Sequence, residues 1–236
     1  MKKKHLYCNG DSWTYGEEIG LDNIQHHLNE KYYNSWPWFL SQELDIPICI
    51  NDAVGAGSND RIYRKTYQFI KDYINKGKDP KELMVVIGWT TPERTEIGMS
   101  VNDDDVEFVR ITTHNVLNMS NNLDKTTMGD IEKYRSHYFN LYSENSGIQR
   151  QLMFMDNLRF LCKQSNIEYY DFIAIGYWPP KIIDKARKLK VKLKNFYLND
   201  TFNNAVVSNK WDVYPLNHPT PETHKKWANV LKKFII

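Results

Sequence analysis

The sequence lacks the features of an exported or membrane-spanning protein. Its apolar runs are too short to cross a bilayer, and the run that follows Lys2-Lys3-Lys4 is broken at Asn9, so it forms no signal-peptide core. The cysteines are few, odd in number and without a C-x-x-C pair, at Cys8, Cys49 and Cys162. We therefore expect buried, reduced thiols, no zinc site and a cytoplasmic protein that would need another route out, such as release by lysis.

Excess charge, internal repeats and linkers are also missing. The formal net charge is only +2, so neither a nucleic acid nor a membrane is expected as a partner. The basic run over residues 181–194 is interpreted as a solvated helix face. With no repeat and no Pro/Gly-rich linker, residues 1–236 are predicted to form a single domain.

The chain does contain an alternation of strand-like and helix-like segments. Short apolar runs typical of strands buried on both faces lie at residues 5–9, 46–50, 83–88 and 167–173. Amphipathic patterns typical of helices lie at residues 36–44, 58–76, 147–165 and 221–235. This alternation predicts an α/β fold: a three-layer α/β/α sandwich with a parallel sheet of about five strands.

The middle of the chain, at about residues 95–145, breaks the alternation. It holds an acidic triplet at residues 103–105, a strand-like segment at 106–112 and polar loops around 120–124. We expect an irregular insertion over one end of the sheet, where the loops of α/β folds place their ligand sites.

Two short motifs point to chemistry. Gly10-Asp11-Ser12 directly follows the first strand, which suits either an ordinary turn or a serine held out as a nucleophile. A serine hydroxyl needs a base, and His218 lies on a loop that Pro215 and Pro219 make rigid, just before the last helix.

Three segments together resemble the SGNH (GDSL-type) hydrolase superfamily. They are "GDSWTYG" from Gly10, "NDAVGAGSN" from Asn51 and the dipeptide His218-Pro219, in the family's order and strand contexts. The likeness frames the chain from residue 5 to 235, leaves residues 95–145 unmatched, and implies a flavodoxin-like SGNH hydrolase fold.

The resemblance also implies roles. Ser12 is then the nucleophile, and its backbone N–H is the first donor to the oxyanion. Gly57, or else Gly55, supplies the second N–H. His218 is the base, and His224 matches a structural histidine that is frequent at that position.

The sequence departs from the family at two points. The asparagine that usually completes the oxyanion hole is missing from the segment "GWTTPER" after the third core strand, so we expect Thr90 or Asn59 to donate instead. The usual aspartate three residues before the histidine is replaced by Pro215. Asp212 would then fold back to orient His218, or a backbone carbonyl would do so.

The segment from Gly88 to Glu96 suggests substrate contacts. The indole of Trp89 offers a flat face for a sugar ring, and Arg94 suits a carboxylate or phosphate. The alternative is structural, with an Arg94–Glu96 ion pair and Trp89 packed in the core.

The sequence thus predicts a serine esterase that acts through a Ser-His acyl-enzyme, without metal or cofactor. The expected substrate is a small ester, with O-acetyl groups on a carbohydrate first, since aromatic residues make up 14% of the chain. Two alternatives stay open: an O-acyltransferase, and a catalytically weak or inactive binding or virion-structural module.

Overall fold

The computed structural model describes residues 2–20, 32–100, 106–112, 116–117, 125–176 and 179–236. Its main sheet has four strands in the order β2-β1-β3-β7. The strands are β1 (His5–Asn9), β2 (Ile48–Asn51), β3 (Leu83–Trp89) and β7 (Glu168–Ile173). All three neighbouring pairs are parallel, with Cys8 of β1 opposite Asn51 and Val86.

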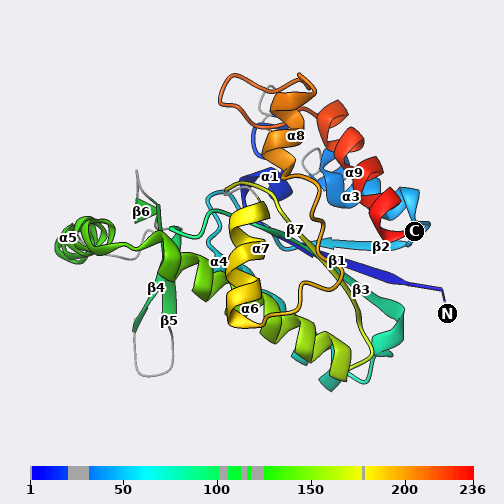
Figure 1. Ribbon diagram of the computed structural model, residues 1–236, viewed down its shortest axis with the longest axis horizontal. Coiled ribbons are helices and arrows are strands. Elements are labelled where there is room, and N and C mark those ends of the chain that lie inside the picture. The colour runs from blue at the N-terminus through cyan, green and yellow to red at the C-terminus, as the bar shows by residue number, and fades with distance from the viewer. Residues whose placement is uncertain (1, 21–31, 101–105, 113–115, 118–124, 177–178) are drawn as a thin grey trace.

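Helices cover both faces of this sheet (Figure 1). One side carries α3 (Trp36–Glu43), α8 (Phe202–Ser208) and α9 (Pro221–Ile235). The other side carries α4 (Asn59–Asn75), α6 (Glu144–Gln164) and α7 (Pro179–Leu189). The short α1 (Ser12–Tyr15) follows β1, and a 3-10 turn, η1 (Pro80–Glu82), precedes β3. The three-layer α/β/α prediction is confirmed.

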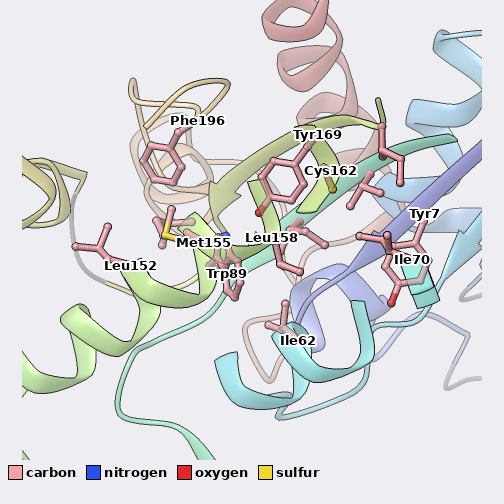
Figure 2. Close-up of a cluster of buried hydrophobic side chains, with 14 of the residues drawn as sticks. Tyr7, Ile62, Ile70, Trp89, Leu152, Met155, Leu158, Cys162, Tyr169 and Phe196 are labelled. Atoms are coloured by element: carbon pink, nitrogen blue, oxygen red, sulfur yellow. The ribbon is translucent and has the colours of Figure 1, made fainter. Parts of the chain in front are cut away.

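Successive side chains of each strand point to opposite faces of the sheet, so the core consists of two clusters. Tyr7 and Val85 face the cluster formed with α4 and α6, of which Figure 2 labels Tyr7, Ile62, Leu158 and others. Leu6 and Val86 face the opposite cluster, which holds the aromatic rings of α3, α8 and α9. Both faces of the central strands are therefore buried, which explains why these strands read as continuous apolar runs.

The sheet is one strand smaller than the predicted five. After α7 the chain returns to the edge of β7 and pairs with it only through a single parallel bridge between Asp171 and Phe196. The Asp171 N–H donates to Asn195 O at 3.1 Å, and the Tyr197 N–H donates to Asp171 O at 2.9 Å. Lysines alternate along the preceding segment, and a charged edge of this kind discourages further strand pairing.

The insertion is more regular than predicted. Within residues 95–145 the structure forms β4 (Thr95–Ser100), β5 (Val106–Ile111), β6 (Val116–Leu117) and α5 (Lys125–Leu141). β4-β5-β6 is a separate antiparallel sheet that packs with α5 around Val109, Ile111 and Ile131. These apolar side chains give the segment a small core of its own, although the acidic triplet and the polar loop at 120–124 lie outside the described residues.

The three cysteines are free and buried, as expected, and burial raises the pKa of Cys49 to about 12. None of the helices in the described ranges has the length and apolarity needed to cross a membrane.

The buried carboxylate of Asp171, on the edge strand β7, leads to a testable prediction. Asp171 is fully buried and accepts from Trp89 Nε1 at 3.0 Å, Tyr169 OH at 2.9 Å and Arg159 Nη2 at 2.6 Å. Asp171→Ala strands the Arg159 charge, so the free energy of unfolding should fall by about 3–5 kcal/mol in urea denaturation. Asp184→Ala removes an exposed pair with Arg187 and should leave the midpoint unchanged. Equal effects of the two variants would contradict this account.

Candidate active site

The nucleophile candidate lies in a sharp turn between β1 and α1. Asp11 caps α1, with its Oδ1 accepting from the Trp13 N–H at 3.0 Å, and Ser12 is the first helical residue. A Cβ at Gly10 would lie 2.1 Å from Thr14 Oγ1 and 2.9 Å from Gly88 O, so only glycine fits there. The turn thus fixes Ser12 at the carboxyl end of β1, where it keeps 7% of its surface exposed.

Asp11 is held from a second side by the segment after β3. Its Oδ2 accepts from the Thr90 hydroxyl at 2.6 Å and from Arg94 Nη1 at 3.4 Å. Burial raises the pKa of Asp11, and Arg94, Thr90, the Trp13 N–H and His218, in that order, oppose the shift. Thr90 was predicted to donate to an oxyanion, and that prediction is wrong because its only hydroxyl proton is already given to a buried carboxylate.

Asn59 also turns out to be a structural residue. Its Nδ2 donates to Thr90 O at 3.1 Å, and its Oδ1 accepts from the Thr90 N–H at 3.0 Å. The two bonds clamp the segment after β3 to the start of α4, and Asn59 is 1% exposed. Nδ2 also donates to Thr91 O at 3.5 Å, so both ends of the amide are engaged and the predicted role of Asn59 in the oxyanion hole is also wrong.

The glycine loop packs directly on the Ser12 turn. A Cβ at Gly57 would lie 2.8 Å from Gly10 O and 3.4 Å from the Cα of Asp11, so the close approach requires glycine. The Gly57 N–H donates to Val54 O at 3.1 Å, so the predicted second oxyanion donor is engaged in a turn. At Gly55 the carbonyl accepts a hydrogen bond from Arg110 of β5, which ties the insertion to this end of the sheet.

The aromatic platform predicted at Trp89 does not exist. Trp89 is fully buried and donates to Asp171, so its indole packs in the core as the structural alternative proposed. The other half of that alternative fails, because Glu96 pairs with Arg64 at 2.7 Å instead of with Arg94. Arg94 remains at the active edge of the sheet, 20% exposed and in contact with Asp11.

The carboxylate in contact with the His218 ring is that of Glu18, which the sequence did not single out. Glu18 Oε2 lies 2.9 Å from His218 Nδ1, and the carboxylate also accepts from the backbone N–H groups of Leu216 at 3.2 Å and His218 at 3.3 Å. The Glu18 side chain is 5% exposed. Because a carboxylate only accepts, this contact places a proton on Nδ1 of His218.

Asp212 is not this acid. Its side chain is exposed, and its contribution to the loop is a backbone carbonyl that accepts from Thr223 Oγ1 at 2.6 Å. Glu18 lies at the position beside His218 Nδ1 that Asp212 was predicted to occupy. Glu18 and His218 are 200 positions apart in the sequence, so no local spacing marks them as a pair.

Short backbone links connect Glu18 to the nucleophile. The Gly16 and Glu17 N–H groups both donate to Ser12 O at 3.1 Å, which sets the start of the Glu18 segment relative to Ser12. The Ser12 turn and the Glu18–His218 contact are thus joined through the backbone of residues 12–18. Across the described chain, no hydrogen bond joins Ser12 Oγ to His218 Nε2, and the Ser12 N–H has no acceptor. In the same ranges no group of His, Cys, Asp and Glu could hold a metal ion.

His224 has the structural role that the resemblance implied. It is fully buried, and its Nδ1 accepts from the Trp36 N–H at 3.2 Å, which joins α9 to α3. Burial, and secondarily the nearby His218, lower the pKa of His224 to about 3. The ring is therefore neutral in the folded protein.

Comparisons with known proteins establish a family and a fold. Residues 22–236 match the Family of unknown function (DUF6071), and the chain belongs to that family. Ser12 and Glu18 precede the matched range. No curated protein matches the sequence significantly.

Solved structures share the fold at low sequence identity. The psychrotrophic esterase EstA from Pseudoalteromonas sp., inhibited by monoethylphosphonate, aligns with a TM-score of 0.50 and 10% identity over 99% of this chain and 97% of that chain. A carbohydrate esterase aligns with a TM-score of 0.49 and 11% identity, over 99% of this chain and 68% of that chain. A protein described as a GDSL-like lipase from Parabacteroides merdae aligns with a TM-score of 0.47 and 14% identity, over 100% of this chain and 97% of that chain. The likeness to EstA shows a shared fold.

The neutral His224 predicts a pH effect on stability. The unfolded chain takes up a proton near pH 6.5, whereas the folded ring does so only near pH 3, so stability is lost as the pH falls from about 6.5. His224→Asn keeps an acceptor for the Trp36 N–H. Between about pH 7.5 and pH 5 this variant should lose about 2 kcal/mol less unfolding free energy than the wild type. Urea denaturation at both pH values tests this, and parallel losses would refute it.

Proposed function

We propose that this member of DUF6071 is a serine hydrolase that cleaves a small carboxylic ester through Ser12, His218 and Glu18. The observation that carries the proposal is the Glu18–His218 contact of 2.9 Å beside the Ser12 turn. A purely structural histidine at a helix entry does not need a buried carboxylate on Nδ1. A general base does, because the carboxylate fixes the tautomer and stabilises the imidazolium.

The proposed reaction follows from these positions. Ser12 Oγ attacks the ester carbonyl while His218 Nε2 takes the hydroxyl proton, and the N–H of Ser12 donates to the oxyanion. His218 then returns the proton to the leaving alcohol as the C–O bond breaks. Water, deprotonated by the same nitrogen, attacks the acyl-enzyme and releases the acid together with free Ser12.

The oxyanion hole of this site is poor in donors. The Gly57 N–H, the Thr90 hydroxyl and the Asn59 amide all have other partners. Removing one such donor typically costs about 3 kcal/mol of transition-state stabilisation. We therefore propose a slow enzyme on simple esters, with acylated carbohydrates as the leading substrate class.

Replacing the nucleophile tests the reaction directly. Ser12→Ala should lower the turnover of p-nitrophenyl acetate by about 10⁴-fold or more, because no acyl-enzyme can form. Intact mass spectrometry should find one fluorophosphonate adduct on the wild type and none on the variant. A wild type without turnover and without an adduct would leave a binding or structural module as the function. Turnover that rises when a sugar acceptor is added, with acylated sugar as product, would instead identify an acyltransferase.

Amide substitutions at Glu18 and Asp212 test which carboxylate supports His218. Glu18→Gln should lower kcat by about 10²–10⁴-fold, because the amide can donate where the Nδ1 proton and the two backbone N–H groups need an acceptor. Asp212→Asn is the matched control and should leave kcat unchanged, since that side chain is exposed. Both variants are compared with the wild type by steady-state kinetics and by circular dichroism. The reverse ranking, with both proteins folded, would return the role of the acid to Asp212.

A further inference from the structure

A cavity of about 320 Å³ lies between the carboxyl-terminal half of α5 and the start of α6. This volume is at the lower end of the range typical of small-molecule sites. Its wall includes Tyr134, His137, Tyr138, Tyr142, Ser146 and Arg150. None of the residues named so far as catalytic contributes to the wall.

Three tyrosines give the cavity an aromatic side. Tyr134, Tyr138 and Tyr142 are spaced four residues apart, so they follow one face of the chain through α5 and its end. The ring centroids of Tyr134 and Tyr138 are 6.2 Å apart and nearly parallel, and those of Tyr138 and Tyr142 are 5.8 Å apart. Tyr134 is 46% exposed, so part of the aromatic wall is open to a ligand.

Arg150 gives the wall of the cavity a cationic group, and no aspartate or glutamate is part of that wall. Its Nη2 also lies 3.7 Å from Oδ2 of Asp60 on α4, which lies outside the wall. Among the described residues, Arg150 donates its hydrogen bonds through Nη2, to Pro92 O at 3.1 Å, Arg94 O at 3.3 Å and Tyr138 OH at 3.2 Å. Within the described chain Nε and Nη1 donate to nothing. The guanidinium is thus held rigidly by one nitrogen and keeps donors for an anion.

Arg150 also connects the cavity to the candidate active site. It binds the carbonyls of Pro92 and Arg94, and the guanidinium of Arg94 in turn contacts Asp11, the residue before Ser12. Two contacts therefore separate the wall of the cavity from the nucleophile turn. A ligand bound at Arg150 would lie along the same edge of the protein.

We propose that this cavity binds a sugar residue that carries a carboxylate, as in a uronic-acid oligosaccharide. The C–H face of a pyranose ring suits the tyrosine wall, its hydroxyls suit Ser146 and the exposed Tyr134, and its carboxylate pairs with Arg150. That the bound oligosaccharide presents its ester to Ser12 rests on the proposed hydrolase function. The binding itself does not.

Binding is measured with Ser12→Ala protein, which cannot hydrolyse the probe. Isothermal titration calorimetry with trigalacturonate should give saturable binding, and the fully methyl-esterified trisaccharide should bind at least about tenfold more weakly because it lacks the charge. Adding Tyr134→Ala should weaken binding about fivefold or more, and adding Ser146→Trp, which fills the cavity, should abolish it. Asn145→Trp on the neighbouring exposed position and Tyr67→Ala on α4 are the controls and should bind as the parent does.

Absence of saturable binding, or binding that Ser146→Trp leaves intact, would overturn the inference. Turnover of p-nitrophenyl acetate by the otherwise wild-type enzyme separates this failure from failure of the proposed function. Tyr134→Ala should lower kcat/KM for O-acetylated trigalacturonate about fivefold or more, whereas the control Tyr67→Ala should change neither this value nor the turnover of p-nitrophenyl acetate. Hydrolysis of the simple ester without sugar binding would contradict the sugar-binding inference but not the proposed hydrolase function. Sugar binding without any turnover would contradict the hydrolase function but not the sugar-binding inference.

Discussion

The carboxylate of Glu18 is the interaction on which the candidate site depends. It is nearly excluded from solvent and accepts from the backbone of Leu216 and from the backbone and ring of His218. A buried carboxylate that loses its donors is strongly destabilised, so the loop that carries His218 cannot move away without stranding this charge. The two ends of the chain are thereby locked together at the site. Glu18 adopts a left-handed backbone with φ of 66°, a conformation that costs about 1 kcal/mol and that these bonds offset.

A second consequence concerns what the neighbouring polar groups do. Thr90 and Asn59 are the residue types expected of an oxyanion hole, yet both use their hydrogen bonds to hold Asp11 and the segment after β3. Such bonds make the Ser12 turn rigid and leave few donors for a transition state. When local stabilisation is limited, binding energy from a remote part of the substrate gains importance, since it can be used to position the reacting ester. A distal sugar site is consistent with that requirement.

These features show which parts of the structure were accessible from sequence. The helix at Pro221–Ile235 and the buried strands follow from periodicity, because packing on a sheet imposes it directly. Ser12 and His218 followed from motifs that lie within short segments. Glu18 could not be found in this way, because its role is defined by a contact with a residue at the far end of the chain. Thr90 and Asn59 were misassigned since residue type shows what a side chain can donate, whereas competing acceptors decide where it does so.

The position of the exposed aromatic side chains also could not be predicted from residue type alone. The aromatic composition predicted a sugar-binding surface, and the sequence placed it at Trp89 because that residue follows a strand at the active edge. The structure buries Trp89 beside Asp171 and exposes instead Tyr134 in the insertion, a region without any motif. Trp89 is the last residue of β3, a strand buried along its whole length, and Asp171 offers its N–H a buried acceptor, so the ring packs in the core. Tyr134, Tyr138 and Tyr142 recur every fourth residue through α5 and its end, and Tyr134 is 46% exposed, so the insertion contributes aromatic surface that no motif marks.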